Sequence, residues 1–295
     1  MSGTTVFDVQ ITRDALGRIT QRIEVIDGIT RVFEYGYDLA GRLSIVRRNG
    51  TLVVLYTYDS NGNRVSAEGE AGLFEGTYDA QDRALTYGNS SYTYTANGDL
   101  ATKTVGGQMT SYAYDTLGNL LQVTKPTGTV ITYMVDGRGR RVRKAIDGVP
   151  VKGWLYADQL RPIAELDGSG AVVARFVYGT RPNVPEYVIR GGVTYRIFSD
   201  HVGSPRIVVN ATTGAVVQRM DFQPFGEIIQ DSSPGWQPFG FAGGLYDPDT
   251  GLLRFGARDY DPQIGRWTAK DPLAFDGGDV GLYAYVGGTR SKYKP

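Results

Sequence analysis

Short runs of alternating apolar and polar residues, separated by turn-forming residues, follow one another along the first half of the chain. The clearest unit contains two tyrosines, an aspartate and a glycine, and it reads Y-G-Y-D-L-A-G-R-L from Tyr35, Y-T-Y-D-S-N-G-N-R-V from Tyr56 and Y-A-Y-D-T-L-G-N-L from Tyr112. Because side chains alternate along a strand, both tyrosines of a unit share one face. The Asp-x-x-Gly step predicts a hairpin turn, since the carboxylate accepts backbone N–H groups and Gly adopts the left-handed conformation.

Weaker copies of this unit fill the gaps between the clear ones. They read R-D-A-L-G-R-I from Arg13, T-Y-D-A-Q-D-R-A-L from Thr77, Y-T-Y-T-A-N-G-D-L from Tyr92 and M-V-D-G-R-G-R-R-V from Met134. The Asp position, or its equivalent, falls at residues 14, 38, 59, 79, 95, 115 and 136. A spacing of about twenty residues fits one β-hairpin per repeat. We therefore predict an all-β fold, an array of antiparallel β-hairpins, and interpret the turn aspartates as caps rather than catalytic groups.

After Asp147 the Tyr-Asp spacing is lost, but strand-like runs persist at residues 171–178, 193–199, 206–210 and 215–222. Glycine-containing turn signals separate these runs. We predict three consecutive segments: the hairpin array over residues 1–146, its continuation with degenerate repeats over 147–243, and a distinct C-terminal segment over 244–295.

Composition narrows the possible functions. Acidic and basic residues balance at 31 each, so the net charge favours neither nucleic acid nor an anionic membrane as a partner. The sequence has no apolar run long enough to insert into a membrane and no signal peptide at its start. It contains no cysteine and one histidine, His201, which excludes thiolate chemistry and most histidine-based sites. We interpret His201 as a turn residue and Arg140-Arg141 as part of a solvated strand face, and we expect neither a cofactor nor a metal.

The C-terminal segment holds the densest cluster of charges, R-D-Y-D-P-Q-I-G-R-W-T-A-K-D-P from Arg258. Its centre predicts a further turn, formed by Asp259, Asp261 and Gly265, with Pro262 at a position that suits a turn. The remaining question is whether the flanking charges do chemistry.

The repeats resemble the YD repeat of the Rhs family of bacterial proteins, and the stretch from Gly244 resembles the C-terminus of the Rhs core. Two further pieces, D-H-V-G-S-P-R from Asp200 and D-F-Q-P-F-G-E from Asp221, resemble the same core. The resemblance implies a spiralling sheet that forms part or all of a hollow β-shell. It also implies a C-terminal plug that acts as an aspartyl autoprotease and frees a C-terminal toxin.

By this resemblance, Asp271 corresponds to the first catalytic aspartate and Arg258 to its supporting arginine. The family's second aspartate belongs to a D-P-x-G motif that this sequence lacks before Pro295. An acid dyad needs two carboxyls that share a proton, so Asp271 alone does not form one. Asp276 and Asp279 are near in sequence, but nothing in the pattern pairs either with Asp271.

Three hypotheses follow. The first is a structural shell or scaffold that encapsulates or delivers a C-terminal toxin cargo, which this chain does not contain. The second is the aspartyl autoprotease, incomplete here, and the third is a module whose tyrosine-rich sheet binds cell-surface glycans. The resemblance implies a bacterial protein, secreted or injected, with a toxin cargo or a delivery apparatus as partner. Exposed strand edges would also permit self-association.

Overall fold

A computed structural model of the chain describes residues 6–271 and 281–285. These residues form 26 β-strands and one short 3-10 helix, η1 (Phe241–Gly243). Strands β1 to β22 belong to one antiparallel sheet, in which each strand pairs with the next along the chain, and β23 to β26 form a separate four-stranded sheet. The predicted all-β array of antiparallel hairpins is confirmed.

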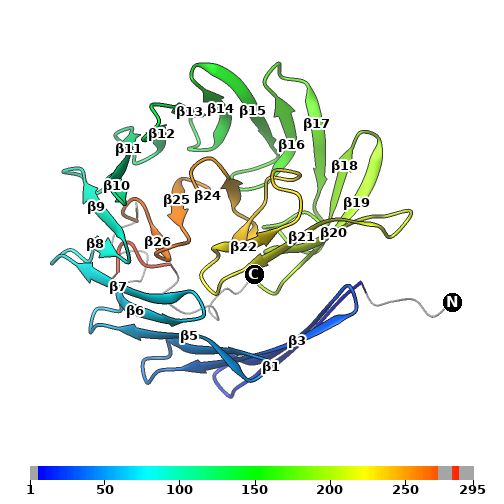
Figure 1. Ribbon diagram of the computed structural model, residues 1–295. Coiled ribbons are helices and arrows are strands. Elements are labelled where there is room, and N and C mark those ends of the chain that lie inside the picture. The colour runs from blue at the N-terminus through cyan, green and yellow to red at the C-terminus, as the bar shows by residue number, and fades with distance from the viewer. Residues whose placement is uncertain (1–5, 272–280, 286–295) are drawn as a thin grey trace. The chain divides into compact units, whose positions relative to one another are not determined.

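The chain divides into two compact units, of which the described parts are residues 6–91 with 281–285, and residues 92–271. The first unit holds β1 to β8, drawn in blue and cyan in Figure 1, and β9 crosses the boundary. The strands are β1 (Phe7–Arg13), β2 (Ile19–Ile26), β3 (Ile29–Tyr37), β4 (Leu43–Arg48), β5 (Thr51–Tyr58), β6 (Arg64–Gly69), β7 (Gly72–Tyr78), β8 (Ala84–Tyr87) and β9 (Ser90–Tyr94).

The second unit holds the remaining strands of the large sheet and the four-stranded sheet. Those of the large sheet are β10 (Leu100–Val105), β11 (Gln108–Tyr114), β12 (Leu120–Thr124), β13 (Val130–Val135), β14 (Arg141–Ile146), β15 (Val149–Tyr156), β16 (Pro162–Asp167), β17 (Val172–Val177), β18 (Tyr187–Arg190), β19 (Val193–Ser199), β20 (Pro205–Asn210), β21 (Val216–Phe222) and β22 (Ile228–Asp231). The four-stranded sheet, called the C-terminal sheet below, comprises β23 (Leu245–Asp247), β24 (Leu252–Phe255), β25 (Arg258–Asp261) and β26 (Arg266–Trp267). In Figure 1 it lies on the concave side of the green strands of the same unit.

The turn predicted from Asp-x-x-Gly is well illustrated by the repeat at Asp38. The Asp38 N–H donates to the Arg42 carbonyl and the Gly41 N–H donates to the Asp38 carbonyl, both at 2.9 Å. The Asp38 carboxylate accepts from the Arg42 N–H and Nε at 2.8 and 2.7 Å, and Gly41 has a φ of 81°. The interpretation of this aspartate as a turn cap is confirmed.

This pair of backbone hydrogen bonds recurs far beyond the recognisable repeats. It is found in the turns that start at residues 14, 38, 59, 79, 95, 115, 125, 136, 167, 200 and 223. Four of these turns, at 125, 167, 200 and 223, belong to none of the seven repeats recognised in the sequence. The hairpin array therefore continues where the sequence pattern fades. The division into segments 1–146, 147–243 and 244–295 stays a prediction.

Contacts between successive repeats explain why the second aromatic residue of the unit is tyrosine. The Tyr58 hydroxyl donates to the Leu43 carbonyl at 2.6 Å, and the Arg42 guanidinium lies 4.6 Å above the Tyr58 ring. The hydroxyls of Tyr37, Tyr78, Tyr156 and Tyr178 bond a carbonyl of the preceding repeat in the same way. Phenylalanine would leave these carbonyls without that donor.

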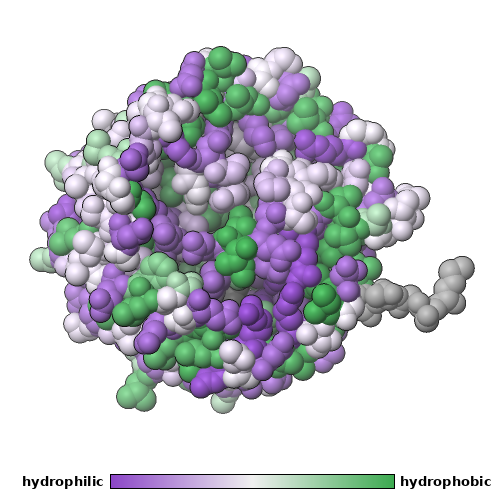
Figure 2. Space-filling view, in the orientation of Figure 1, coloured by the Kyte–Doolittle hydropathy of each residue, from purple (hydrophilic) through white to green (hydrophobic). Residues whose placement is uncertain are grey.

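Apolar packing in the second unit centres on one cluster. Trp154, Phe176, Val188 and Ile197 from the large sheet pack with Phe239, which precedes the C-terminal sheet. The rings of Phe176 and Phe239 meet edge to face, with centroids 4.9 Å apart. On the face shown in Figure 2, hydrophobic and hydrophilic residues are interspersed. The contact of Phe239 thus fixes the residues that lead into the C-terminal sheet against the strands of their own unit.

Candidate functional site

The two residues that the family resemblance marks for chemistry lie together. Arg258 is the first residue of β25 and Asp271 follows β26, and their Nη2 and Oδ2 atoms are 3.0 Å apart. The Arg258 guanidinium also lies 4.2 Å above the Trp267 ring. Burial lowers the pKa of Arg258, and the negative charge of Asp271 opposes that shift. The two residues thus form an ion pair, and the catalytic roles that the resemblance implies for them stay a prediction.

The pair borders a cavity of about 920 Å³. One side of the cavity is formed by the turns of three successive repeats, which start at Thr95, Asp115 and Asp136, and the other by residues 257–258 and 269–271. The turns approach this segment closely: a Cβ on Gly118 would lie 3.9 Å from the Ala269 Cβ, and one on Gly139 would lie 3.5 Å from the Ala257 Cβ. The cavity is thus a space between repeat turns and the C-terminal segment.

Asp99 also lines this cavity. Asp99 is only 7% exposed, and Thr95 Oγ1 donates a hydrogen bond to Asp99 Oδ2 over 3.4 Å. Burial raises the pKa of Asp99, against the opposing effects of that hydrogen bond and of the positive charge on Lys270. Our sequence analysis did not select Asp99. The signal was nevertheless present, because Y-T-Y-T-A-N-G-D-L places threonine where the repeat has aspartate and aspartate where it has Arg or Asn.

The other residues considered from the sequence do not join this site. Asp276 and Asp279 lie outside the described residues. His201 lies in the turn that begins at Asp200, whose carboxylate accepts the N–H groups of Val202 and Ser204. The turn position expected for His201 is therefore confirmed.

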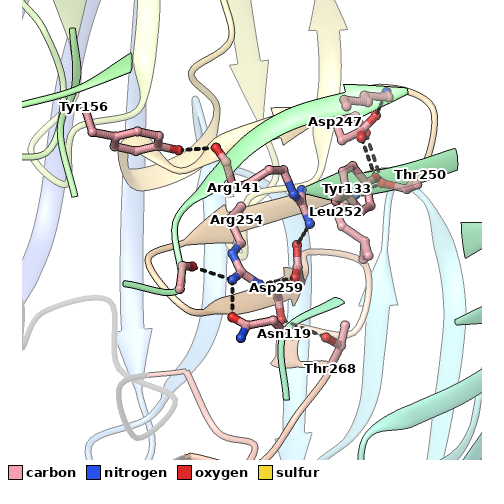
Figure 3. A network of polar contacts seen from close by, with 12 residues as sticks. Asn119, Tyr133, Arg141, Tyr156, Asp247, Thr250, Leu252, Arg254, Asp259 and Thr268 are labelled. Carbon is pink, nitrogen blue, oxygen red and sulfur yellow. Dashed lines mark hydrogen bonds and ion pairs between the residues drawn. The ribbon is translucent and has the colours of Figure 1, made fainter. Parts of the chain in front are cut away.

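A buried ionic network joins the C-terminal sheet to the large sheet (Figure 3). The Asp259 carboxylate accepts from Arg141 Nη2 at 2.9 Å and from Arg254 Nη1 at 2.7 Å, and all three side chains are at most 2% exposed. Arg254 Nη2 also donates to Asn119 Oδ1 and to the Gly139 carbonyl, both at 2.8 Å. The network thus connects β24 and β25 to the repeat turns and to β14.

Two predictions about this network are wrong. Arg141 does not lie on a solvated strand face, because it is buried and its guanidinium lies 3.5 Å from the Tyr133 ring centroid. Asp259 is not a turn residue, because it lies within β25 between two guanidinium groups. The turn itself is correctly predicted: the Gly265 N–H donates to the Asp261 carbonyl at 2.9 Å, and Gly265 has a φ of 70°.

Two more cations of the large sheet reach carboxylates of the C-terminal segment. Lys144 of β14 contacts Asp247 at 2.5 Å and also pairs with Asp249, and Lys103 of β10 contacts Asp261 at 2.8 Å. The Tyr133 hydroxyl donates to the second Asp247 oxygen at 2.6 Å. Burial opposes ionisation of Asp247, but the charge and hydrogen bond of Lys144, together with the Tyr133 hydrogen bond and the Arg141 charge, outweigh it and the pKa is lowered. Asp247 is therefore a buried carboxylate that a lysine holds ionised.

These contacts fasten one sheet to another. Within residues 6–271 and 281–285, no three His, Cys, Asp or Glu side chains are grouped so that they could hold a metal ion. In the same described ranges, no helix has the length and apolar character needed to cross a membrane. What the geometry does supply is a set of long-range, buried cation–carboxylate contacts beside a polar cavity.

Comparisons with known proteins agree with this architecture. A family profile described as the teneurin YD-shell matches residues 1–277. Teneurin-3 of Danio rerio is 33% identical over 272 residues, which cover 89% of this chain and 10% of that protein. Teneurin-1 of Gallus gallus is 33% identical over 267 residues, covering 88% of this chain and 10% of that protein. The chain therefore spans about a tenth of the length of these relatives.

More distant similarities reach bacterial proteins. The tRNA3(Ser)-specific nuclease WapA of Bacillus spizizenii is 25% identical over 236 residues, which cover 77% of this chain and 10% of that protein. A solved Tc holotoxin pore of Photorhabdus luminescens aligns with 99% of this chain and 19% of its own, at 17% identity and a TM-score of 0.47. The expected bacterial, secreted or injected location is wrong, because the relatives that are about one-third identical are vertebrate teneurins.

Proposed function

The chain belongs to the teneurin YD-shell family, and we propose that it acts as a structural scaffold, a hairpin array whose own C-terminal sheet is fastened to it by buried ion pairs. The observation that carries this proposal is the pairing of Lys103, Arg141 and Lys144 with Asp261, Asp259 and Asp247. The paired residues are 158, 118 and 103 positions apart in sequence. Contacts of this kind hold distant segments in one arrangement.

Buried ion pairs suit this role for a physical reason. Desolvation offsets much of their Coulombic attraction, so they add little net stability compared with apolar packing. A misplaced partner, however, leaves a buried charge uncompensated, which costs several kcal/mol. The three pairs therefore select one register of the C-terminal sheet and disfavour all others.

Hydrogen exchange measured by mass spectrometry tests the scaffold proposal. Lys144→Met removes the cation shared by Asp247 and Asp249, and peptides from β23–β24 should lose protection while peptides from β17–β19 keep theirs. Arg161→Met is the control, because the ion pair of Arg161 with Asp158 has side chains that are 41% and 43% exposed, so its loss leaves no buried charge. Unchanged protection of β23–β24 in the Lys144 variant would refute the fastening role.

The autoprotease remains a second candidate, favoured by the 3.0 Å contact between Arg258 and Asp271. In a chain extended beyond residue 295, Asp271→Asn should leave an uncleaved product on a denaturing gel, with the unsubstituted extended chain cleaved in parallel. Equal cleavage of both chains would remove Asp271 from the chemistry.

The toxin cargo and the glycan-binding alternative have weaker support. The cargo hypothesis rests on the similarity to a nuclease of Bacillus spizizenii. To test it, the chain would be expressed together with the polypeptide encoded next to it, the link between them cut with a protease, and co-purification of the two pieces measured. The glycan hypothesis rested on exposed tyrosines, whereas Tyr35, Tyr56, Tyr92 and Tyr112 are all buried. Of the three original hypotheses, the scaffold has the most support.

A further inference from the structure

The repeat that begins at Thr95 reverses the usual order of acid and partner. In the other clear repeats the first turn residue is an aspartate, and the residue four positions later is Arg or Asn and bonds back to it, as Asn119 bonds to Asp115 at 2.9 Å. Here Thr95 takes the first position and Asp99 the last. The aspartates at the first position receive two backbone N–H groups from later residues of their own turn, whereas among the described residues the only side chain that donates to the Asp99 carboxylate is Thr95.

This exceptional carboxylate faces the cavity beside the C-terminal segment. A Cβ on Gly118, whose turn also lines the cavity, would lie 3.6 Å from Asp99 Oδ1. Among the described residues, no other residue donates to Oδ1 and Asp99 makes no ion pair. A carboxylate on a residue that is only 7% exposed, with no ion-pair partner, is electrostatically incomplete, because burial disfavours its charge unless an opposite charge compensates it.

The other acids that line the cavity already have partners. Asp115 and Asp136 cap their own turns, Asp136 pairs with Arg140 at 2.7 Å, and Asp271 pairs with Arg258. Asp99 is therefore the one acid of the cavity, within the described part of the chain, that is available to a ligand.

We propose that the cavity binds a guanidinium or primary ammonium group through the Asp99 carboxylate, a binding site that goes beyond the scaffold role. A guanidinium is the better match, because its planar fork of donors can engage both oxygens of a carboxylate. The cavity volume of about 920 Å³ exceeds what such a group needs, so the group can be carried by a larger molecule. Two sources share this chemistry: a small organic cation, and the side chain of Arg or Lys in a peptide.

Lys270 weakens the affinity of this site for a cation, because its own positive charge competes with the ligand for the Asp99 carboxylate. It lines the cavity and its positive charge opposes the rise that burial causes in the pKa of Asp99, but it forms no ion pair with Asp99 in the described residues. Arg138, which is exposed, also lines the cavity. Removal of the Lys270 charge should therefore strengthen binding of a cation.

Titration calorimetry of the whole chain at low ionic strength tests the site. The probes are n-butylguanidinium, the neutral isostere n-butylurea, and an acetylated, amidated Ala-Arg-Ala peptide. We expect saturable binding of butylguanidinium, none of butylurea, at least about tenfold weaker binding after Asp99→Asn because a charge-assisted contact is lost, and tighter binding after Lys270→Gln. Peptide binding at least tenfold tighter than butylguanidinium identifies a polypeptide as the source, and equal affinities identify a small cation.

The Asp99→Asn variant should keep the fold, because asparagine occupies the corresponding turn position at Asn63 and Asn119. Its circular dichroism and thermal midpoint provide the check. Asp8→Asn, which removes an exposed acid in the other unit, is the charge-matched control and should bind as the unsubstituted chain does. Absence of saturable binding, equal binding by the Asp99→Asn variant, or equal binding of butylurea would each overturn the proposal.

Discussion

A substitution of the Asp259 carboxylate should affect the stability of the C-terminal sheet strongly, because this buried group contacts two guanidinium groups. Asp259→Asn keeps the shape of the side chain but removes the charge shared by Arg141 and Arg254, which contact it at 2.9 and 2.7 Å. Two guanidinium groups that are about 2% exposed would then lie near each other without a carboxylate. We expect this change to destabilise the second unit strongly.

The magnitude follows from the surroundings of each partner. Loss of one member of a buried ion pair costs roughly 3–5 kcal/mol, because the remaining charge stays desolvated. Arg254 keeps Asn119 Oδ1 and the Gly139 carbonyl, and the Arg141 guanidinium keeps its position over the Tyr133 ring. We therefore take the loss as about 4 kcal/mol, near the middle of that range and a large part of the stability of an ordinary domain.

Urea unfolding followed by tryptophan fluorescence measures this loss. All three tryptophans, Trp154, Trp236 and Trp267, lie in the second unit, so the signal reports on that unit. For an m-value of about 3 kcal/mol/M, a loss of about 4 kcal/mol moves the midpoint down by about 1.3 M.

An exposed ion pair provides the control for that measurement. Arg161→Gln disrupts a pair with Asp158 whose side chains are 41% and 43% exposed, and it should cost at most about 1 kcal/mol. If Asp259→Asn shifts the midpoint no more than Arg161→Gln does, the idea that this carboxylate completes a desolvated network is refuted.

Three other outcomes can be measured on the same chain. The pKa of Asp247 is held below its ordinary value of 3.8, because Lys144, Tyr133 and Arg141 together outweigh the effect of burial. The stability that this ionised carboxylate gives is present above pH 3.8 and is lost as the pH falls through the lowered pKa. The urea midpoint should therefore fall steeply below about pH 4, and a flat profile would contradict this. Gly118→Ala should cost about 1–2 kcal/mol, because its φ is +80°, whereas Gly137→Ala, with open space and no left-handed φ, should stay within about 0.5 kcal/mol; equal effects would exclude backbone strain. Tyr58→Phe removes a 2.6 Å hydrogen bond to a backbone carbonyl and should cost about 1 kcal/mol by calorimetry, and no change would show that the carbonyl is satisfied otherwise.

The hairpin turns could be predicted because their chemistry is local. A turn such as that at Asp38 is determined within five residues, by a carboxylate, a glycine and a returning arginine. The sequence pattern missed the turns at 125 and 223 because Lys and Gln stand there in place of aspartate. In those turns the backbone hydrogen bonds alone suffice, and they leave no mark on the first residue.

The candidate site was only partly predictable, because some of its partners lie more than a hundred residues apart in the sequence. Arg258 and Asp271 were recognised from a motif thirteen residues apart, and they do form an ion pair. Arg141 was misread because alternation along β14 says which residues share a face but not what covers that face. Its partner Asp259 lies 118 residues later, and no local pattern connects the two.

The separation of charge signs between the sheets has a consequence for the order of folding. Lys103, Arg141 and Lys144 are synthesised more than a hundred residues before the carboxylates that neutralise them. Hairpins formed from the early strands close short loops quickly, whereas docking of the C-terminal sheet must wait for long-range closure. Until then, three cations of the array lack their counter-charges and can be compensated only by water and salt. A nascent or truncated chain would thus carry three uncompensated positive charges, which are neutralised only when the last strands dock.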